Sequence, residues 1–159
     1  MRDEVEILSV ARQPVWLLLH ENHVPAGFPS PAGDHRGQRV DLNRILLPHP
    51  DCTYLARVAG DSMSGAPGHI ADGALLAVDC ALRAQSGDVV VAAVEGEFTV
   101  KRLEQRGDEW YLVADNPKYP ARPVSQLGAE FQVWGVVTHV VTELINGKLH
   151  EHVRARRLQ

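Results

Sequence analysis

Two residues with the chemistry of a nucleophile and a base, Ser62 and Lys101, stand 39 positions apart. Ser62 lies in the stretch GDSM, just past the apolar run TYLARV, and the glycine beside it permits unusual backbone angles. A serine at the end of a strand can be presented with backbone N–H groups around it, and these could hold an oxyanion. Most serines in such Gly-x-Ser stretches only form turns, so this stretch alone does not establish a nucleophile.

The segments around Lys101 predict a β-hairpin. Glu95-Gly96 separates VVVAAV from EFTVKRL, and such a pair favours a two-residue turn. In that hairpin Lys101 stands opposite Val90, and Thr99, on the same face, stands opposite Ala92. An ammonium held against apolar side chains loses hydration, which favours the neutral amine, and a neutral amine can act as a general base. The alternative is a lysine whose stem packs on the sheet while its charged head stays in water.

Histidines offer a second way to activate the serine. A Ser/His/Asp set could form from Ser62 with His69 and Asp72 in the following loop, or with His139, although the spacing does not require it. We expect His69 to be a solvent-exposed loop residue. No metal site is predicted, because the paired histidines lack a surrounding carboxylate or thiol pattern. These pairs are His20 with His23 and His150 with His152.

The elements that must position these residues are short β-strands between turn signals, with no repeat and no long amphipathic helix among them. We therefore predict a mainly β fold. One compact β domain covers residues 39–144, a flexible N-terminal arm covers residues 1–38, and a polar tail covers residues 145–159. Residues 4–20 could form either a short helix or a docked strand. The expected strands are 53–58, 74–78, 88–94, 97–103, 109–114 and 131–144.

Composition limits the class of protein. The chain of 159 residues suits one domain, and its 45% apolar and 23% charged residues are typical of a soluble globular protein. A net charge of −4 and a pI near 6.0 give no basic footprint, so strong direct binding to nucleic acid is not expected. The longest apolar run, residues 15–19, is too short to span a membrane, and the acidic start is unlike a secretory signal. Because Cys52 and Cys80 follow neither a metal nor a disulfide pattern, we expect a cytoplasmic protein with reduced thiols and no cofactor.

Several stretches together resemble the LexA/UmuD family of self-cleaving Ser-Lys peptidases, and its UmuD branch in particular. They are GDSM at 60–63, AGFPSPAGD at 26–34, RVDLNRILLPHP at 39–50, GDVVVAAVEGEFTVKRL at 87–103 and FQVWGVVTHVV at 131–141. The resemblance implies the fold of that family's C-terminal domain, with Ser62 as nucleophile and Lys101 as base. It implies an oxyanion hole made by the backbone amides of Asp61 and Ser62. It also implies that the chain cuts itself between Ala26 and Gly27.

The Pro-rich strip at 25–34 fits such a substrate, because its prolines keep it out of helices and central strands and leave it extended. The resemblance further implies that a RecA filament on single-stranded DNA promotes cleavage in the SOS response to DNA damage. The product, residues 27–159, would then work as a homodimer with an error-prone UmuC-type polymerase in translesion DNA synthesis. Only 26 residues precede the cleavage bond, too few for a helical DNA-binding domain, which favours this role over repression.

Other readings of the same residues stay open. A signal-peptidase relative would also use a Ser-Lys pair, but the sequence shows no membrane anchor. The chain could instead be a non-enzymatic polymerase-binding module, or a LexA-type or phage-type transcriptional regulator. Compared with the UmuD pattern, Ala26 stands where a cysteine is usual, and the segment after Ser62 is slightly longer.

Overall fold

The structure, a computed structural model, describes residues 5–8, 16–20 and 37–144. Its strands are β1 (Val5–Leu8), β2 (Trp16–His20), β3 (Gly37–Asp41), β4 (Thr53–Val58), β5 (Leu75–Asp79), β6 (Val89–Val94), β7 (Glu97–Arg106), β8 (Glu109–Val113), β9 (Arg122–Pro123) and β10 (Gln132–Val141). The helical elements are α1 (Leu42–Leu46) and the short 3-10 turn η1 (Val124–Gln126). The predicted mainly β fold is confirmed.

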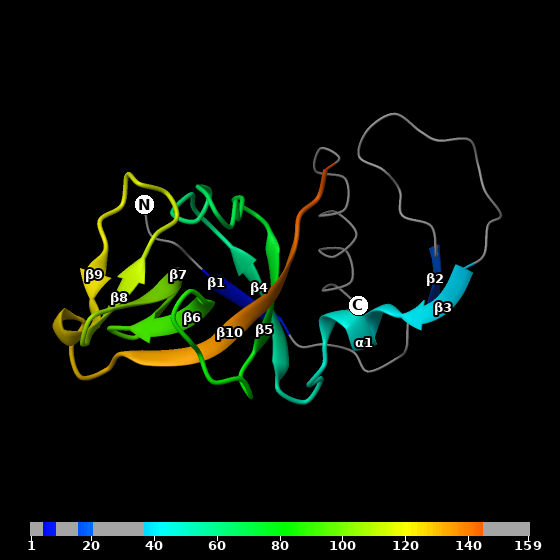
Figure 1. Ribbon diagram of the computed structural model, residues 1–159, viewed down its shortest axis with the longest axis horizontal. Coiled ribbons are helices and arrows are strands. Elements are labelled where there is room, and N and C mark those ends of the chain that lie inside the picture. The colour runs from blue at the N-terminus through cyan, green and yellow to red at the C-terminus, as the bar shows by residue number, and fades with distance from the viewer. Residues whose placement is uncertain (1–4, 9–15, 21–36, 145–159) are drawn as a thin grey trace, which may run out of the picture.

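One antiparallel sheet dominates the fold, with the strand order β1-β4-β5-β10-β6-β7-β8-β9. A separate two-stranded sheet pairs β2 with β3. In Figure 1 this small sheet lies at one end of the molecule and β8 and β9 lie at the other, with α1 leading from β3 toward the main sheet. The Asp41 carboxylate caps α1 by accepting from the Asn43 backbone N–H at 3.0 Å.

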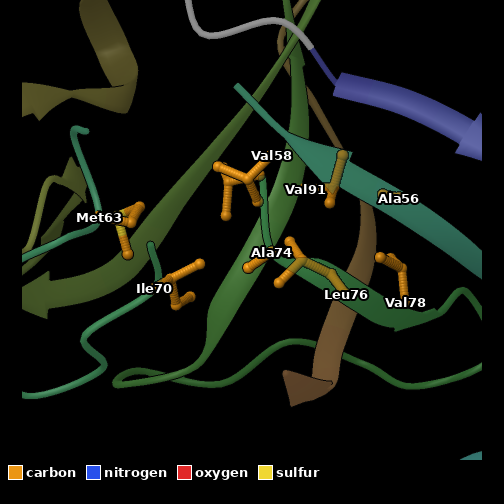
Figure 2. Packing of buried hydrophobic residues seen from close by; sticks show 9 residues of the cluster. Ala56, Val58, Met63, Ile70, Ala74, Leu76, Val78 and Val91 are labelled. Atoms are coloured by element: carbon orange, nitrogen blue, oxygen red, sulfur yellow. The ribbon is translucent and has the colours of Figure 1, made fainter. Parts of the chain in front are cut away.

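Two groups of buried apolar side chains hold the main sheet together. The first lies around β4 and β5 and takes in the loop between them, where Met63 and Ile70 turn toward the strand residues (Figure 2). The second lies on β6, β7 and β8, beside η1. Met63, the residue directly after the candidate nucleophile Ser62, is thus anchored in the core. The first group consists of Ala56, Val58, Met63, Ile70, Ala74, Leu76, Val78, Val91 and Val100, and the second of Val90, Ala92, Leu103, Leu112 and Leu127.

The predicted hairpin is confirmed in its register. Val90 pairs with Lys101 and Ala92 pairs with Thr99, and the turn between β6 and β7 has positive φ at both Glu95 (53°) and Gly96 (80°). Two successive positive φ angles define the tight turn whose twist matches paired strands. β7 runs to Arg106, beyond the predicted end at 103, because β8 pairs with that extension.

β10 is shorter than the predicted strand at 131–144. It ends at Val141, which pairs with Leu75, the first residue of β5, so β5 offers no further residue for pairing beyond this point. Its register shifts twice, once on each side of Gly135. A Cβ at Gly135 would come within 2.7 Å of the Val78 side chain, so only glycine allows β5 to approach this closely.

The sequence left open whether residues 4–20 form a short helix or a docked strand. The described residues of this range, 5–8 and 16–20, form strands. β1 pairs with β4 at the edge of the main sheet, with Val5 opposite Val58. β2 pairs with β3, with His20 opposite Gly37. The predicted boundary between arm and domain, at 38 and 39, falls inside β3.

Candidate active site

The candidate nucleophile lies in the loop that follows β4. Gly60 turns the chain there at a φ of +109°, and its N–H donates to Asp72 Oδ1 at 2.9 Å. Ser62 is only 3% exposed. Its neighbour Met63 is buried, and the Met63 carbonyl accepts from the Ile70 N–H at 2.8 Å, which draws the loop toward the core. The serine is therefore held in a fixed loop and shielded from bulk water.

Lys101 approaches the same serine from β7. Its Nζ donates to Ser62 Oγ, to Thr99 Oγ1 and to the Val100 carbonyl, each at 2.9 Å. These contacts match the three N–H donors of an ammonium. A neutral amine keeps two donors, so with Thr99 and Val100 still as acceptors its lone pair faces Ser62 and can accept the hydroxyl proton. The amine is thus turned toward the serine instead of extending into water.

A cleft of about 210 Å³ reaches Lys101 and Thr99 from the side of the β6–β7 turn. Five of its ten lining residues are apolar and four are charged. Ser62 is not among the residues that line this cleft. The apolar lining residues are Val94, Phe98, Leu112, Pro120 and Leu127, and the charged ones besides Lys101 are Glu95, Glu97 and Arg122.

We call residues 59–74, the loop between β4 and β5 that carries Ser62, the nucleophile loop. Residues 115–119, which we call the clamp segment, connect β8 to the loop before β9 and contact the nucleophile loop. Asn116 Nδ2 donates to the Asp61 carbonyl at 3.0 Å, and the Asn116 backbone N–H donates to the Ser62 carbonyl at 2.9 Å. The Tyr119 hydroxyl donates to Asp61 Oδ1. The sequence interpretation missed this segment. The only signal it offers is Asp-Asn-Pro directly after a strand, which predicts a turn and nothing more.

Arg102, next to Lys101 on β7, joins the strand of the lysine to the clamp segment. Its Nε and one terminal nitrogen donate to the Asp115 carboxylate at 2.8 and 2.6 Å, which raises the pKa of Arg102 from its ordinary value. Asp115 Oδ2 also accepts from the Gly68 backbone N–H at 3.1 Å. A Cβ at Gly65 would clash with the Asp115 carbonyl, so the nucleophile loop lies directly on the clamp segment.

The residues of the alternative Ser/His/Asp set make other contacts. Asp72 accepts from the Gly60 N–H, and His139 Nδ1 lies 3.1 Å from Thr138 Oγ1. His69 is exposed, as expected, and has a positive φ of 48°. Among the residues that the structure describes, no cluster of three or more His, Cys, Asp or Glu side chains is arranged to hold a metal ion. The predicted cleavage residues Ala26 and Gly27 lie outside the described residues, between β2 and β3.

A mainly β domain that holds a serine hydroxyl against a lysine amine has the arrangement needed by a serine peptidase that uses lysine as its base. The chain belongs to the Peptidase S24-like family, which its residues 18–138 match. This membership, with the relatives below, confirms the resemblance to the LexA/UmuD family. In the described ranges, no helix has the length and apolar character to cross a membrane.

The relatives cover most of the chain. It is 41% identical to protein MucA of Salmonella typhimurium over 120 residues, 76% of this chain and 80% of MucA. It is 40% identical to protein ImpA of Shigella flexneri over 131 residues, 77% of this chain and 81% of ImpA. Its 37% identity to the LexA repressor of Colwellia psychrerythraea extends over 118 residues, 74% of this chain but 54% of that repressor.

Proposed function

We propose that this protein is a self-cleaving serine peptidase that cuts its own bond between Ala26 and Gly27, with Ser62 as nucleophile and Lys101 as general base. The observation that carries the proposal is the 2.9 Å contact between Lys101 Nζ and Ser62 Oγ. That distance lies within the range across which a base can take the proton of a nucleophile.

The reaction proceeds in two halves. Lys101, as the neutral amine, accepts the Ser62 proton while Oγ attacks the Ala26 carbonyl carbon, and the backbone amides of Asp61 and Ser62 hold the oxyanion. The proton then passes from Lys101 to the Gly27 nitrogen as the C–N bond breaks. In the second half, the same amine deprotonates a water molecule, which hydrolyses the ester between Ser62 and Ala26 and restores the serine.

The position of the proposed substrate in the chain supports the proposal. Residues 21–36 connect two strands that pair with each other, so both ends of the segment are held. The prolines within this segment favour the extended shape that a peptidase cleft accepts. The products are residues 1–26 and 27–159.

The role that fits this reaction is in the SOS response, in the cytoplasm. A RecA filament on single-stranded DNA promotes the cleavage, and residues 27–159 act as a homodimer with a UmuC-type polymerase in error-prone translesion synthesis. The Peptidase S24-like match over residues 18–138 and the similarity to MucA and ImpA over about three quarters of the chain support this role.

Self-cleavage can be tested with the purified full-length chain. Mass spectrometry should detect a fragment that begins at Gly27, and an activated RecA filament should speed its appearance. Ser62→Ala should abolish the fragment. Ser125→Ala is the control, because Ser125 is an exposed serine of η1, outside the loop that carries Ser62, and its substitution should leave cleavage intact. An unchanged fragment in Ser62→Ala would overturn the proposal, and an intact wild-type chain would favour a non-enzymatic polymerase-binding module.

The LexA match favours one second candidate, a transcriptional regulator. The matched region covers 54% of that repressor, so we rank repression by this chain below the mutagenesis role. A gel-shift measurement with operator-like DNA separates the two roles. Specific, salt-resistant retardation would support the regulator, and its absence would support the mutagenesis role.

A further inference from the structure

Asn116 contacts the backbone on both sides of the candidate nucleophile. Its side-chain Nδ2 donates to the Asp61 carbonyl at 3.0 Å, and its own backbone N–H donates to the Ser62 carbonyl at 2.9 Å. Asn116 is 7% exposed, so these bonds form away from bulk water. Asn116 thus holds two successive carbonyl groups, that of Asp61 and that of Ser62 itself.

The geometry of the peptide bond gives these two contacts a consequence. Each peptide unit is planar and trans, so its N–H points opposite to its C=O. The Asp61 carbonyl belongs to the same unit as the Ser62 N–H, and the Ser62 carbonyl belongs to the same unit as the Met63 N–H. The Asp61 carbonyl also accepts from the Ser64 N–H at 3.1 Å and from Ser64 Oγ at 2.8 Å. Asn116 and Ser64 together therefore set the direction of the Ser62 N–H, and Asn116 also sets that of the Met63 N–H.

Asn116 is itself held firmly. Its Oδ1 accepts from the Lys118 N–H at 3.1 Å, which fixes the orientation of the side-chain amide so that Nδ2 faces Asp61. Its neighbour Asp115 is bound by Arg102 on β7. The clamp segment therefore connects the strand that carries the lysine with the loop that carries the serine.

We propose that Asn116 is a positioning residue that orients the Ser62 backbone N–H so that it meets the oxyanion as it forms. This inference rests on the proposed self-cleavage and deepens it. Asn116 contacts neither the base nor the scissile bond in this account. It acts on the transition state through the peptide plane between Asp61 and Ser62, which carries the Ser62 N–H.

The test compares rate with transition-state binding in the full-length protein. Asn116→Ala should lower the rate of self-cleavage by about tenfold or more, since removal of a direct oxyanion donor lowers rates by about 10²–10³. The probe is a peptide of residues 22–26 that ends in a boronic acid, which forms a tetrahedral adduct with an active serine. Its half-inhibiting concentration should rise by about the same factor as the rate falls. The same peptide ending in an amide should inhibit equally well before and after the substitution.

Two further variants keep the test decisive. Asn116→Asp keeps the shape of the side chain and its backbone N–H but loses the donor to Asp61, so it should behave like Asn116→Ala. Thr138→Val, on β10, removes a hydroxyl that donates to the Ala77 carbonyl and should change neither rate nor boronate potency appreciably. Equal losses for the boronate and the amide peptide would show a merely structural role and overturn the inference, as would wild-type cleavage by folded Asn116 variants. A wild-type chain that does not cleave would instead overturn the proposed function itself.

Discussion

Arg102 donates two N–H groups to the Asp115 carboxylate, at 2.8 and 2.6 Å, from the position directly after Lys101 on β7. The Arg102 side chain is 15% exposed and that of Asp115 is 2% exposed. A third donor of Arg102 reaches the Gly87 carbonyl at 2.6 Å. This ion pair links the strand of the lysine to the segment that holds the nucleophile loop, so its loss should affect stability as well as the site.

Removal of the cation should destabilise the fold strongly. Arg102→Met leaves the buried Asp115 carboxylate without its partner, which should lower the free energy of unfolding by about 3–5 kcal/mol. Urea denaturation measures the change. Arg106→Met is the control, because the Arg106–Glu104 pair lies at the surface of the same strand and should contribute at most about 1 kcal/mol. Similar losses in the two variants would contradict the importance assigned to the buried pair.

Thr99 should matter for rate and little for stability. Its hydroxyl accepts from Lys101 Nζ, and Thr99→Val removes that acceptor while keeping the shape of the side chain. The amine then loses one of the contacts that direct it at Ser62, so self-cleavage should slow by about tenfold or more, a part of the usual contribution of a general base. Thr138→Val removes a hydroxyl that bonds the Ala77 carbonyl, and it should leave the rate unchanged. An unchanged rate in Thr99→Val would show that the lysine needs no such support.

Cleavage between Ala26 and Gly27 should loosen the edge of the main sheet. It separates β1 from the rest of the chain, and β1 is paired with β4 through four residue pairs. Hydrogen exchange of the β4 amides, followed by mass spectrometry, should therefore be faster in self-cleaved protein than in the intact chain. β6 is the internal control, because β10 and β7 flank it on both sides in either state. Equal protection of β4 before and after cleavage would contradict this expectation.

Alkaline pH should weaken the fold through Cys80. Burial raises the pKa of the Cys80 thiol above its ordinary value of 9.0, with smaller contributions from Asp79 and Cys52. Above that ordinary value the unfolded chain loses the proton while the folded chain keeps it, so the free energy of unfolding falls as pH rises through the folded pKa. Urea denaturation at about pH 8 and about pH 10 should show this fall, and Cys80→Ala should reduce it. A fall of the same size in the variant would place its cause elsewhere.

The part of the site that lies within one hairpin could be predicted from the sequence. Glu95-Gly96 defines the turn, and the pairing of Val90 with Lys101 then follows by counting along the strands. Local pattern was sufficient there because a hairpin is a local structure. Local sequence could not decide between helix and strand for residues 4–20, because β1 and β2 form by pairing with β4 and β3, which come later in the chain.

The support of the nucleophile loop could not be predicted in the same way. Asn116 bonds a carbonyl 55 positions earlier in the chain, and no periodicity marks such a contact. The burial of Ser62 likewise depends on Met63 entering the core and on the clamp segment lying across the loop. Motifs can indicate which residues carry out the chemistry, whereas the residues that orient them become visible only in the packed structure.

The most direct test of the account is the rate of self-cleavage at about pH 7 and about pH 10 in wild type, Lys101→Ala and Ser62→Ala. The neutral fraction of an ordinary lysine amine rises about tenfold for each pH unit below about 10.4, so a lysine base should cleave faster in alkali. Circular dichroism at both pH values confirms that the chain is folded. We expect a fragment that begins at Gly27, forms faster at the higher pH, and is absent from both variants. An intact wild-type chain at both pH values, even with an activated RecA filament, would contradict this expectation, as would an unchanged fragment in Lys101→Ala.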